Sequence, residues 1–282
     1  MVHSQNNILL IVEGERTEPR IFNKFVDIIG RRDFNLKIIN LNTNIYALYN
    51  KIKSYNIDFD DDSTSTIDVL KSILKDDRRN EELKILDQKF PYIYLVFDFE
   101  IQDKLFNLLQ KKGLLLEMLN YFNDETENGL LLINYPMIES LKDFKFPIPN
   151  LIYKDALIDV DACMKYKHIC SLRSDGNDIR KYNKQVFEKL VFQNICKANY
   201  LCNFDYNKPD YNTFMELIVG RSIVVNQFAK IEDSGSLGIL CCALFLFVSY
   251  YGKEYYEKMN FDFAESNENL NWIICSKKYS IV

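Results

Sequence analysis

Hydrophobic positions in the first half of the chain alternate between short unbroken runs and helical spacings. The unbroken runs, which predict buried strands, are 8–12, 36–41, 92–97 and 130–133. Apolar residues recur every three or four positions in the segments between them, and this predicts helices over 21–29, 45–52, 67–74 and 105–122. Pro19 lies in the first turn of the first helix and Gly30 ends it, whereas Gly113 interrupts the last. This order predicts an α/β fold: an open, parallel sheet flanked by helices.

The second half has a different pattern. After residue 148 it becomes mainly helical, with helices predicted over 179–201, 211–231 and 237–259. The longest apolar stretch, 237–251, has about fifteen residues and is shorter than the roughly 18 to 20 of a membrane span, so we interpret it as a buried core helix. We therefore expect an α/β domain over 1–148 and a mainly helical region over 149–282, with no membrane partner.

Composition adds limits on environment and partners. The 282 residues are 48% hydrophobic and carry a net charge of −5, so the surface as a whole does not attract polyanions. Seven cysteines without a C-x-x-C pair favour a reduced, cytoplasmic setting over a disulfide framework or a zinc site. The start of the chain has no basic segment, and its first apolar run has five residues, so we expect no signal peptide.

Acidic residues follow two of the predicted strands. Glu13 follows the run 8–12, and Asp98 and Glu100 follow the run 92–97. Ligands gather beyond the carboxyl ends of parallel strands, so these carboxylates are expected at one site. Crowded carboxylates repel one another unless a cation binds, and oxygen ligands without histidine favour Mg²⁺ or Mn²⁺. Such a site points to phosphoryl transfer or phosphodiester cleavage.

Ordinary structural roles compete with this interpretation. An acid near a helix N-terminus, such as Glu13, is favoured by the helix dipole, and Asp98 is also compatible with a plain loop acid. Asp103 is better explained as a helix N-cap than as a ligand. The acidic segment 57–63 is expected to be a solvated turn.

The motifs "LIVEGERTEPRIF" and "VFDFE" together resemble the Toprim domain of topoisomerases, bacterial primases and OLD-family nucleases. Within that group the first motif is particularly similar to the RloB-like branch, which is associated with anti-phage and restriction loci. "INYPMIESL" (133–141) resembles a later segment of that branch, and the likeness covers roughly residues 7–145. The second motif departs from the family in one position, since the usual Asp-x-Asp is Asp98-Phe99-Glu100 here.

The resemblance implies a Toprim-like sheet and a role for each matching acid. Glu13 would be a general acid/base or metal ligand, and Asp98 a catalytic metal ligand. Glu18 and Glu100 would be further metal ligands, and Glu139 matches the glutamate of a helix preceded by proline. The function implied is a metal-dependent nuclease acting on DNA or RNA in anti-phage defence.

A basic stretch in the second half is the candidate nucleic-acid interface. The residues that we expect to contact nucleic acid are Lys165, Lys167, Arg173, Arg180 and Lys181. Lysines and arginines attract phosphates, and the neighbouring tyrosines offer rings on which a base can stack. The competing interpretation is an ordinary solvated helix face.

Two other functions stay open. The first is a non-catalytic regulatory or binding subunit that partners an ATPase or another defence effector. The chain has no G-x-x-x-x-G-K-[ST] loop, so any ATPase must be a separate protein. The second is a phosphatase of the haloacid dehalogenase kind. The segment "VFDFE" also resembles the Asp-x-Asp loop of those enzymes, although that loop normally follows the first strand. Expected partners are nucleic acid, such a defence protein, or further copies of the chain.

Overall fold

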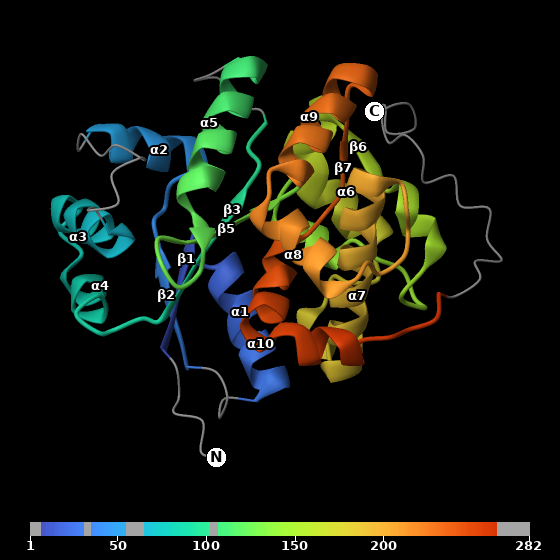
Figure 1. The fold of residues 1–282 in the computed structure, drawn as a ribbon, viewed down its shortest axis with the longest axis horizontal. Helices are drawn as coiled ribbons and strands as arrows, with labels where there is room; N and C mark the ends of the chain where they lie inside the picture. The colour runs from blue at the N-terminus through green and yellow to red at the C-terminus, as the bar shows by residue number, and fades with distance from the viewer. Residues whose placement is uncertain (1–6, 31–34, 55–64, 102–106, 264–282) are drawn as a thin grey trace. The chain divides into compact units, whose positions relative to one another are not determined.

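A computed structural model describes residues 7–30, 35–54, 65–101 and 107–263 of the protein (Figure 1). The chain forms two compact units. Unit 1 comprises residues 1–97 and 109–131, and unit 2 comprises 98–108 and 132–282. The division falls inside the strands that cover 92–98 and 129–134, rather than near residue 148 where composition changes.

The five-stranded sheet has the order β2-β1-β3-β5-β4. Its strands are β1 (Asn7–Val12), β2 (Asn35–Asn40), β3 (Tyr92–Asp98), β4 (Asn123–Asp124) and β5 (Gly129–Asn134). β1 pairs in parallel with both β2 and β3, and β4 pairs antiparallel with β5. Residues 8–12 of β1 are fully buried, as expected of a central strand covered on both faces. The predicted α/β fold is confirmed at this level.

Unit 1 also contains α1 (Thr17–Ile29), α2 (Ile45–Ser54), α3 (Thr66–Asp76), α4 (Asn80–Ile85) and most of α5 (Leu108–Tyr121). Figure 1 shows α1 on one side of β1 and β2, and α3 and α4 on the other. α1 buries the apolar stripe predicted for it and ends at Gly30, whose φ is +114°. Gly113 does not interrupt α5. It occupies an exposed helical position, so its missing side chain leaves no cavity in the core.

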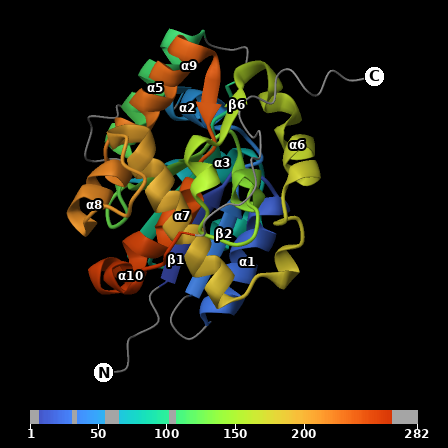
Figure 2. The ribbon, with the colours of Figure 1, turned by 90° about the vertical axis from the view of Figure 1, so that its right-hand side faces the viewer.

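Unit 2 is mainly helical, as predicted. Its longer helices are α6 (Tyr166–Arg173), α7 (Lys184–Asn203), α8 (Tyr211–Val219), α9 (Ser222–Ser234) and α10 (Phe245–Lys258). α7 packs against α8 and α9, and α8 packs against α10 (Figure 2). A small antiparallel sheet pairs β6 (Leu157–Asp159) with β7 (Ser236–Gly238), and α9 packs on β7.

Short 3₁₀ helices connect these elements. They are η1 (Ile138–Lys142), η2 (Leu151–Asp155), η3 (Val160–Lys165), η4 (Ile179–Lys181) and η5 (Cys242–Leu244). Three predicted helices differ from the structure. The helix predicted over 179–201 begins only at Lys184, because 179–181 form η4 and Asn183 caps α7. The helix predicted over 211–231 is two helices separated at Gly220, whose extended backbone (ψ 176°) cannot continue α8. The helix predicted over 237–259 begins only at Phe245, because its first residues form β7 and η5.

The apolar stretch 237–251 is buried in unit 2 over nearly its whole length. Among the residues that the structure describes, no helix combines the length and hydropathy needed to cross a bilayer. The six cysteines in the same residues are free thiols. The acidic segment 57–63 and Asp103 lie outside the described residues.

Candidate functional site

The turn after β1 places one predicted acid in the interior of unit 1. The Glu18 side chain lies in the first turn of α1 and is only 5% exposed. Its Oε1 accepts a hydrogen bond from the backbone N–H of Gly14, with an N···O distance of 3.1 Å. A Cβ at Gly14 would lie 2.8 Å from Glu18 Oε2, so a side chain there would push the carboxylate out of its present position. Glu13, half-buried, directly follows β1. The Glu-Gly motif is thus a turn shaped around Glu18.

Asp98 ends β3 and belongs to unit 2, where two donors hold its carboxylate. Asp98 Oδ1 accepts the backbone N–H of Ile138 at 2.8 Å and the Asn134 amide nitrogen at 3.4 Å. The amide of the fully buried Asn134 has only one orientation that fits, because its Oδ1 accepts the backbone N–H of Ala243 at 3.0 Å. The direction of the Asp98 carboxylate is therefore set by buried groups behind it.

The turn that follows β3 contains an unusual backbone conformation. Glu100 has a φ of +45°, a left-handed conformation that residues other than glycine seldom adopt. The preceding Phe99 is fully buried, and its N–H donates to the carbonyl oxygens of Asn134 (3.0 Å) and Pro136 (3.2 Å). These bonds fix the start of the turn. The half-buried Glu100 side chain is therefore presented by a constrained backbone at the position where the sequence predicts a ligand.

Two buried acids of unit 2 are held by basic residues of α6. The Glu139 side chain is 7% exposed and forms an ion pair with Lys167 at 3.1 Å. The fully buried Asp143 accepts hydrogen bonds from the Arg173 guanidinium and, at 2.7 Å, from the Tyr166 hydroxyl. Burial, together with the negative charge of Asp143, raises the pKa of Tyr166 well above its ordinary value. This cluster joins η1 to α6.

Three of the five residues predicted to contact nucleic acid are paired with acids of the same chain. The Arg173 side chain is only 9% exposed, and its guanidinium is engaged by Asp143, so it belongs to the interior and not to a phosphate-binding surface. Arg180 is exposed, but Asp178 accepts two hydrogen bonds from it at 2.7 and 2.9 Å. Lys165 and Lys181 are exposed. A phosphate would therefore meet Lys165 and Lys181 without first displacing the acid partners that Lys167 and Arg180 have.

The donor chemistry fits a hard cation, but the described residues do not form a complete ligand set. Carboxylate oxygens are the ligands that Mg²⁺ and Mn²⁺ prefer. Glu13 and Glu18 belong to unit 1, whereas Asp98 and Glu100 belong to unit 2. Within the ranges that the structure describes, no three acidic, histidine or cysteine side chains lie together in a metal-binding arrangement. The metal therefore stays a prediction from the sequence.

Sequence reasoning missed one functional candidate, Lys197, which is buried in α7 and lines a pocket in unit 2. One feature distinguishes Lys197 from other lysines. The surrounding segment 190–199 is buried throughout, and a charged residue in such a segment is rare. No protein-family model, curated protein or solved structure matches the chain. The Toprim resemblance therefore depends on the motifs alone.

Proposed function

We propose that the protein is a metal-dependent nuclease of the Toprim class, which hydrolyses phosphodiester bonds of DNA or RNA in anti-phage defence. The observation that supports the proposal is the register of β1 and β3. These strands are parallel neighbours, and Val12 pairs with Val96. Glu13 follows Val12 directly and Asp98 follows Val96 by two residues, so both acids lie at the carboxyl ends of adjacent parallel strands. That is the order in which the Toprim motifs are expected.

The residues around each acid suit a preorganised site. The Ile138 N–H and the Asn134 amide both donate to Asp98 Oδ1, so the carboxylate is oriented before a ligand binds. Glu18 is likewise held by the Gly14 N–H. Groups that are already oriented avoid the entropic cost of ordering when substrate binds. In this proposal the Glu13 carboxylate accepts or returns the proton of the attacking water.

A divalent cation, when bound, would polarise the scissile phosphate and lower the pKa of a coordinated water. The protein's own contribution is to hold the acids in place and to attract the strand. Lys165 and Lys181 are the exposed residues of the basic stretch best suited to contact phosphates.

A cleavage assay tests the proposal. Purified protein is incubated with end-labelled single-stranded DNA, duplex DNA and RNA, with Mg²⁺ or Mn²⁺ and with EDTA. We expect cleavage that EDTA abolishes and that Asp98→Asn, which keeps the shape of the side chain, reduces at least 100-fold. Glu254→Gln, on the surface of α10, is the matched control and should cleave normally. Equal cleavage by Asp98→Asn and wild type would refute the assignment.

One observation favours a second candidate, a non-catalytic subunit that binds a partner ATPase or another effector. The usual Asp-x-Asp pair is Asp98-Phe99-Glu100 here, so the chain lacks the second aspartate of that pair. This candidate predicts a stable complex with a partner chain and no hydrolysis under any metal condition. Size-exclusion chromatography with the products of neighbouring genes, run beside the cleavage assay, separates the two.

A further inference from the structure

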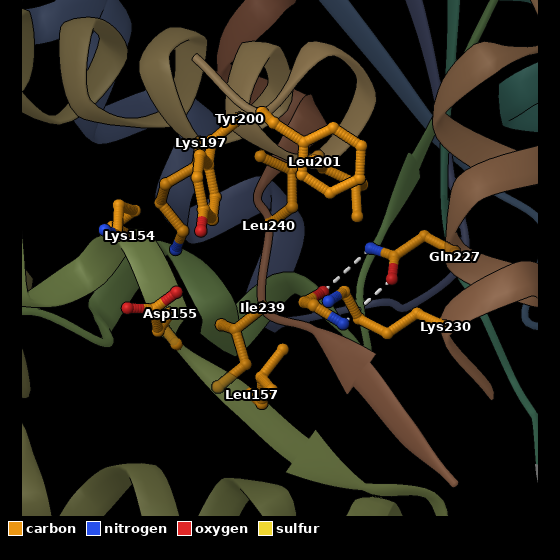
Figure 3. A pocket seen from close by; sticks show the side chains of 13 residues that line it. Lys154, Asp155, Leu157, Lys197, Tyr200, Leu201, Gln227, Lys230, Ile239 and Leu240 are labelled. Carbon is orange, nitrogen blue, oxygen red and sulfur yellow. Dashed lines mark hydrogen bonds between the residues drawn. The ribbon is translucent and has the colours of Figure 1, made fainter. Parts of the chain in front are cut away.

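A pocket in unit 2 lies apart in the sequence from every acid that the motifs single out. It has a volume of about 90 Å³ and is formed by η2, β6, α7, α9 and β7 (Figure 3). Leu157, Leu201, Ile239 and Leu240 contribute apolar walls. Space for one water needs roughly 10–15 Å³, so a ligand group of several non-hydrogen atoms fits. The pocket therefore combines apolar walls with several charged groups and has room for part of a small ligand.

Lys197 is the most unusual group in this pocket. Its side chain is only 7% exposed, and burial lowers its pKa to about 8. No hydrogen bond or ion pair joins its Nζ to any residue in the described parts of the chain. The Nζ lies over the Tyr153 ring, 5.8 Å from its centroid. Asp143 attracts the ammonium without touching it and is already paired with Arg173. A buried cation without an anion in direct contact is costly.

The charge of the pocket lining is positive. Lys154 and Lys230 line it together with Lys197, and Asp155 is the one acid among the lining residues. Figure 3 shows the side chains of Lys154, Asp155 and Lys197 around the same part of the pocket. The Gln227 amide already forms two 2.8 Å hydrogen bonds with the backbone of Gly238, so it is not oriented to bind a ligand. The lysines therefore remain as the groups that a ligand meets, and they select an anion.

Two aromatic rings lie beside these lysines. Tyr200 lines the pocket, and the Lys154 Nζ lies 5.3 Å from the centroid of its ring. Phe204, which ends α7, is 82% exposed and has a left-handed backbone (φ 59°). Glycine is the usual residue at such a helix end, and a large exposed ring there contributes little to folding. The ring is better explained by a flat ligand that stacks on it.

We propose that this pocket binds a nucleoside monophosphate group, with the phosphate on Lys197 and Lys154 and the base against Tyr200 and Phe204. A phosphate supplies the negative charge that Lys197 lacks, and every base offers a face for stacking. The group can come from a free mononucleotide or from the phosphorylated end of a strand. The proposal does not depend on nuclease activity.

Binding is expected to weaken as the pH rises above 8. The ammonium form of Lys197 is the one that attracts a phosphate, and its population falls above a pKa of about 8. The other charged or titratable groups that face Lys197 are Asp143, Arg173, Tyr153, Cys241, Cys242, Lys154, Asp155 and Lys230. Burial raises the pKa of Cys241 to about 12 and that of Cys242 well above its ordinary value, so both stay neutral in this range.

Calorimetric titration of the intact protein tests the proposal in EDTA, where no hydrolysis occurs. The probes are AMP, GMP, CMP and UMP, with adenosine and inorganic phosphate as partial ligands. We expect at least one nucleotide to bind 10-fold more tightly than either partial ligand. Lys197→Met should weaken binding at least 10-fold, and Phe204→Ala about 10-fold, because stacking on one ring is removed. Lys184→Met, an exposed change on the same helix, is the control.

The outcomes separate clearly. Phe204 is exposed, so its variant reports on binding even where Lys197→Met fails to fold. A 5′-phosphorylated dinucleotide that binds more tightly than AMP assigns the site to strand ends, and weaker binding assigns it to free nucleotides. Absence of binding by all four mononucleotides and the dinucleotide at millimolar concentration, or undiminished binding by both variants, would overturn the proposal. Equal affinity for phosphate and nucleotides would refute the role of the rings.

Discussion

Replacing Lys197 by methionine should make the protein more stable, although it changes a buried side chain. The Lys197 pKa falls from 10.5 to about 8 because burial disfavours the ammonium form. One pH unit corresponds to about 1.36 kcal/mol. Keeping the charge inside the fold therefore costs up to about 3 kcal/mol at pH 7, relative to the unfolded chain. Methionine has a similar length and carries no charge, so this cost disappears.

The pH dependence follows from the same two pKa values. Between pH 8 and 10.5 the unfolded chain binds a proton that the folded chain has released, so the stability of the wild type rises with pH across this window. Above 10.5 both states are neutral and the cost is gone. The stabilisation by Lys197→Met should therefore shrink from about 3 kcal/mol at pH 7 to about 1 kcal/mol at pH 9.5.

Urea unfolding followed by far-ultraviolet circular dichroism at pH 7 and pH 9.5, in buffers without phosphate, measures both quantities. Lys184→Met is the control, because that side chain is 69% exposed and should change stability by no more than about 0.5 kcal/mol. Destabilisation by Lys197→Met, or a gain that is equal at the two pH values, would refute the reasoning. Such a result would mean that the ammonium has a structural partner in the folded protein.

Three further variants test other parts of the structure by the same unfolding assay. Gly14→Ala places a methyl group against the Glu18 carboxylate and should cost about 1 kcal/mol through loss of its hydrogen bond; unchanged stability would contradict this account of the turn. Asp143→Asn removes the charge that pairs with the buried Arg173 guanidinium and should cost roughly 3–5 kcal/mol, whereas a loss below 1 kcal/mol would mean that other groups or water stabilise the guanidinium. Phe204→Gly should stabilise the free protein by about 1 kcal/mol because it relieves the left-handed backbone, and a loss of stability would show that the ring supports the fold.

The sequence predicts the α/β half of the fold well because its signals are local. The run 8–12 is only five residues long and is followed by Gly14, which favours a buried strand, and it lies in β1. The apolar stripe of α1, with Pro19 near its start and Gly30 at its end, likewise defines one helix. Such signals need no knowledge of the rest of the chain.

Long-range contacts decide the elements that the sequence does not predict. The stretch 237–251 is apolar at almost every position, so its pattern has no period that separates strand from helix. Its first residues become β7 because β6, distant in the sequence, pairs with them. Arg173 illustrates the same limit for sites, since only the tertiary structure brings Asp143 to its guanidinium. Lys197 in turn becomes a candidate only once the burial of α7 is known.

The central functional claim is that Glu13 and Asp98 act together in one nuclease site, and a double-variant cleavage assay tests it most directly. Residues that act as a unit lose activity non-additively, so removing the second costs little once the first is gone. We predict that Glu13→Gln and Asp98→Asn each reduce Mg²⁺-dependent cleavage at least 100-fold and that the double variant is no slower than the slower single variant. Wild-type cleavage that survives either substitution, or no cleavage by the wild type of DNA or RNA with either metal, would contradict it.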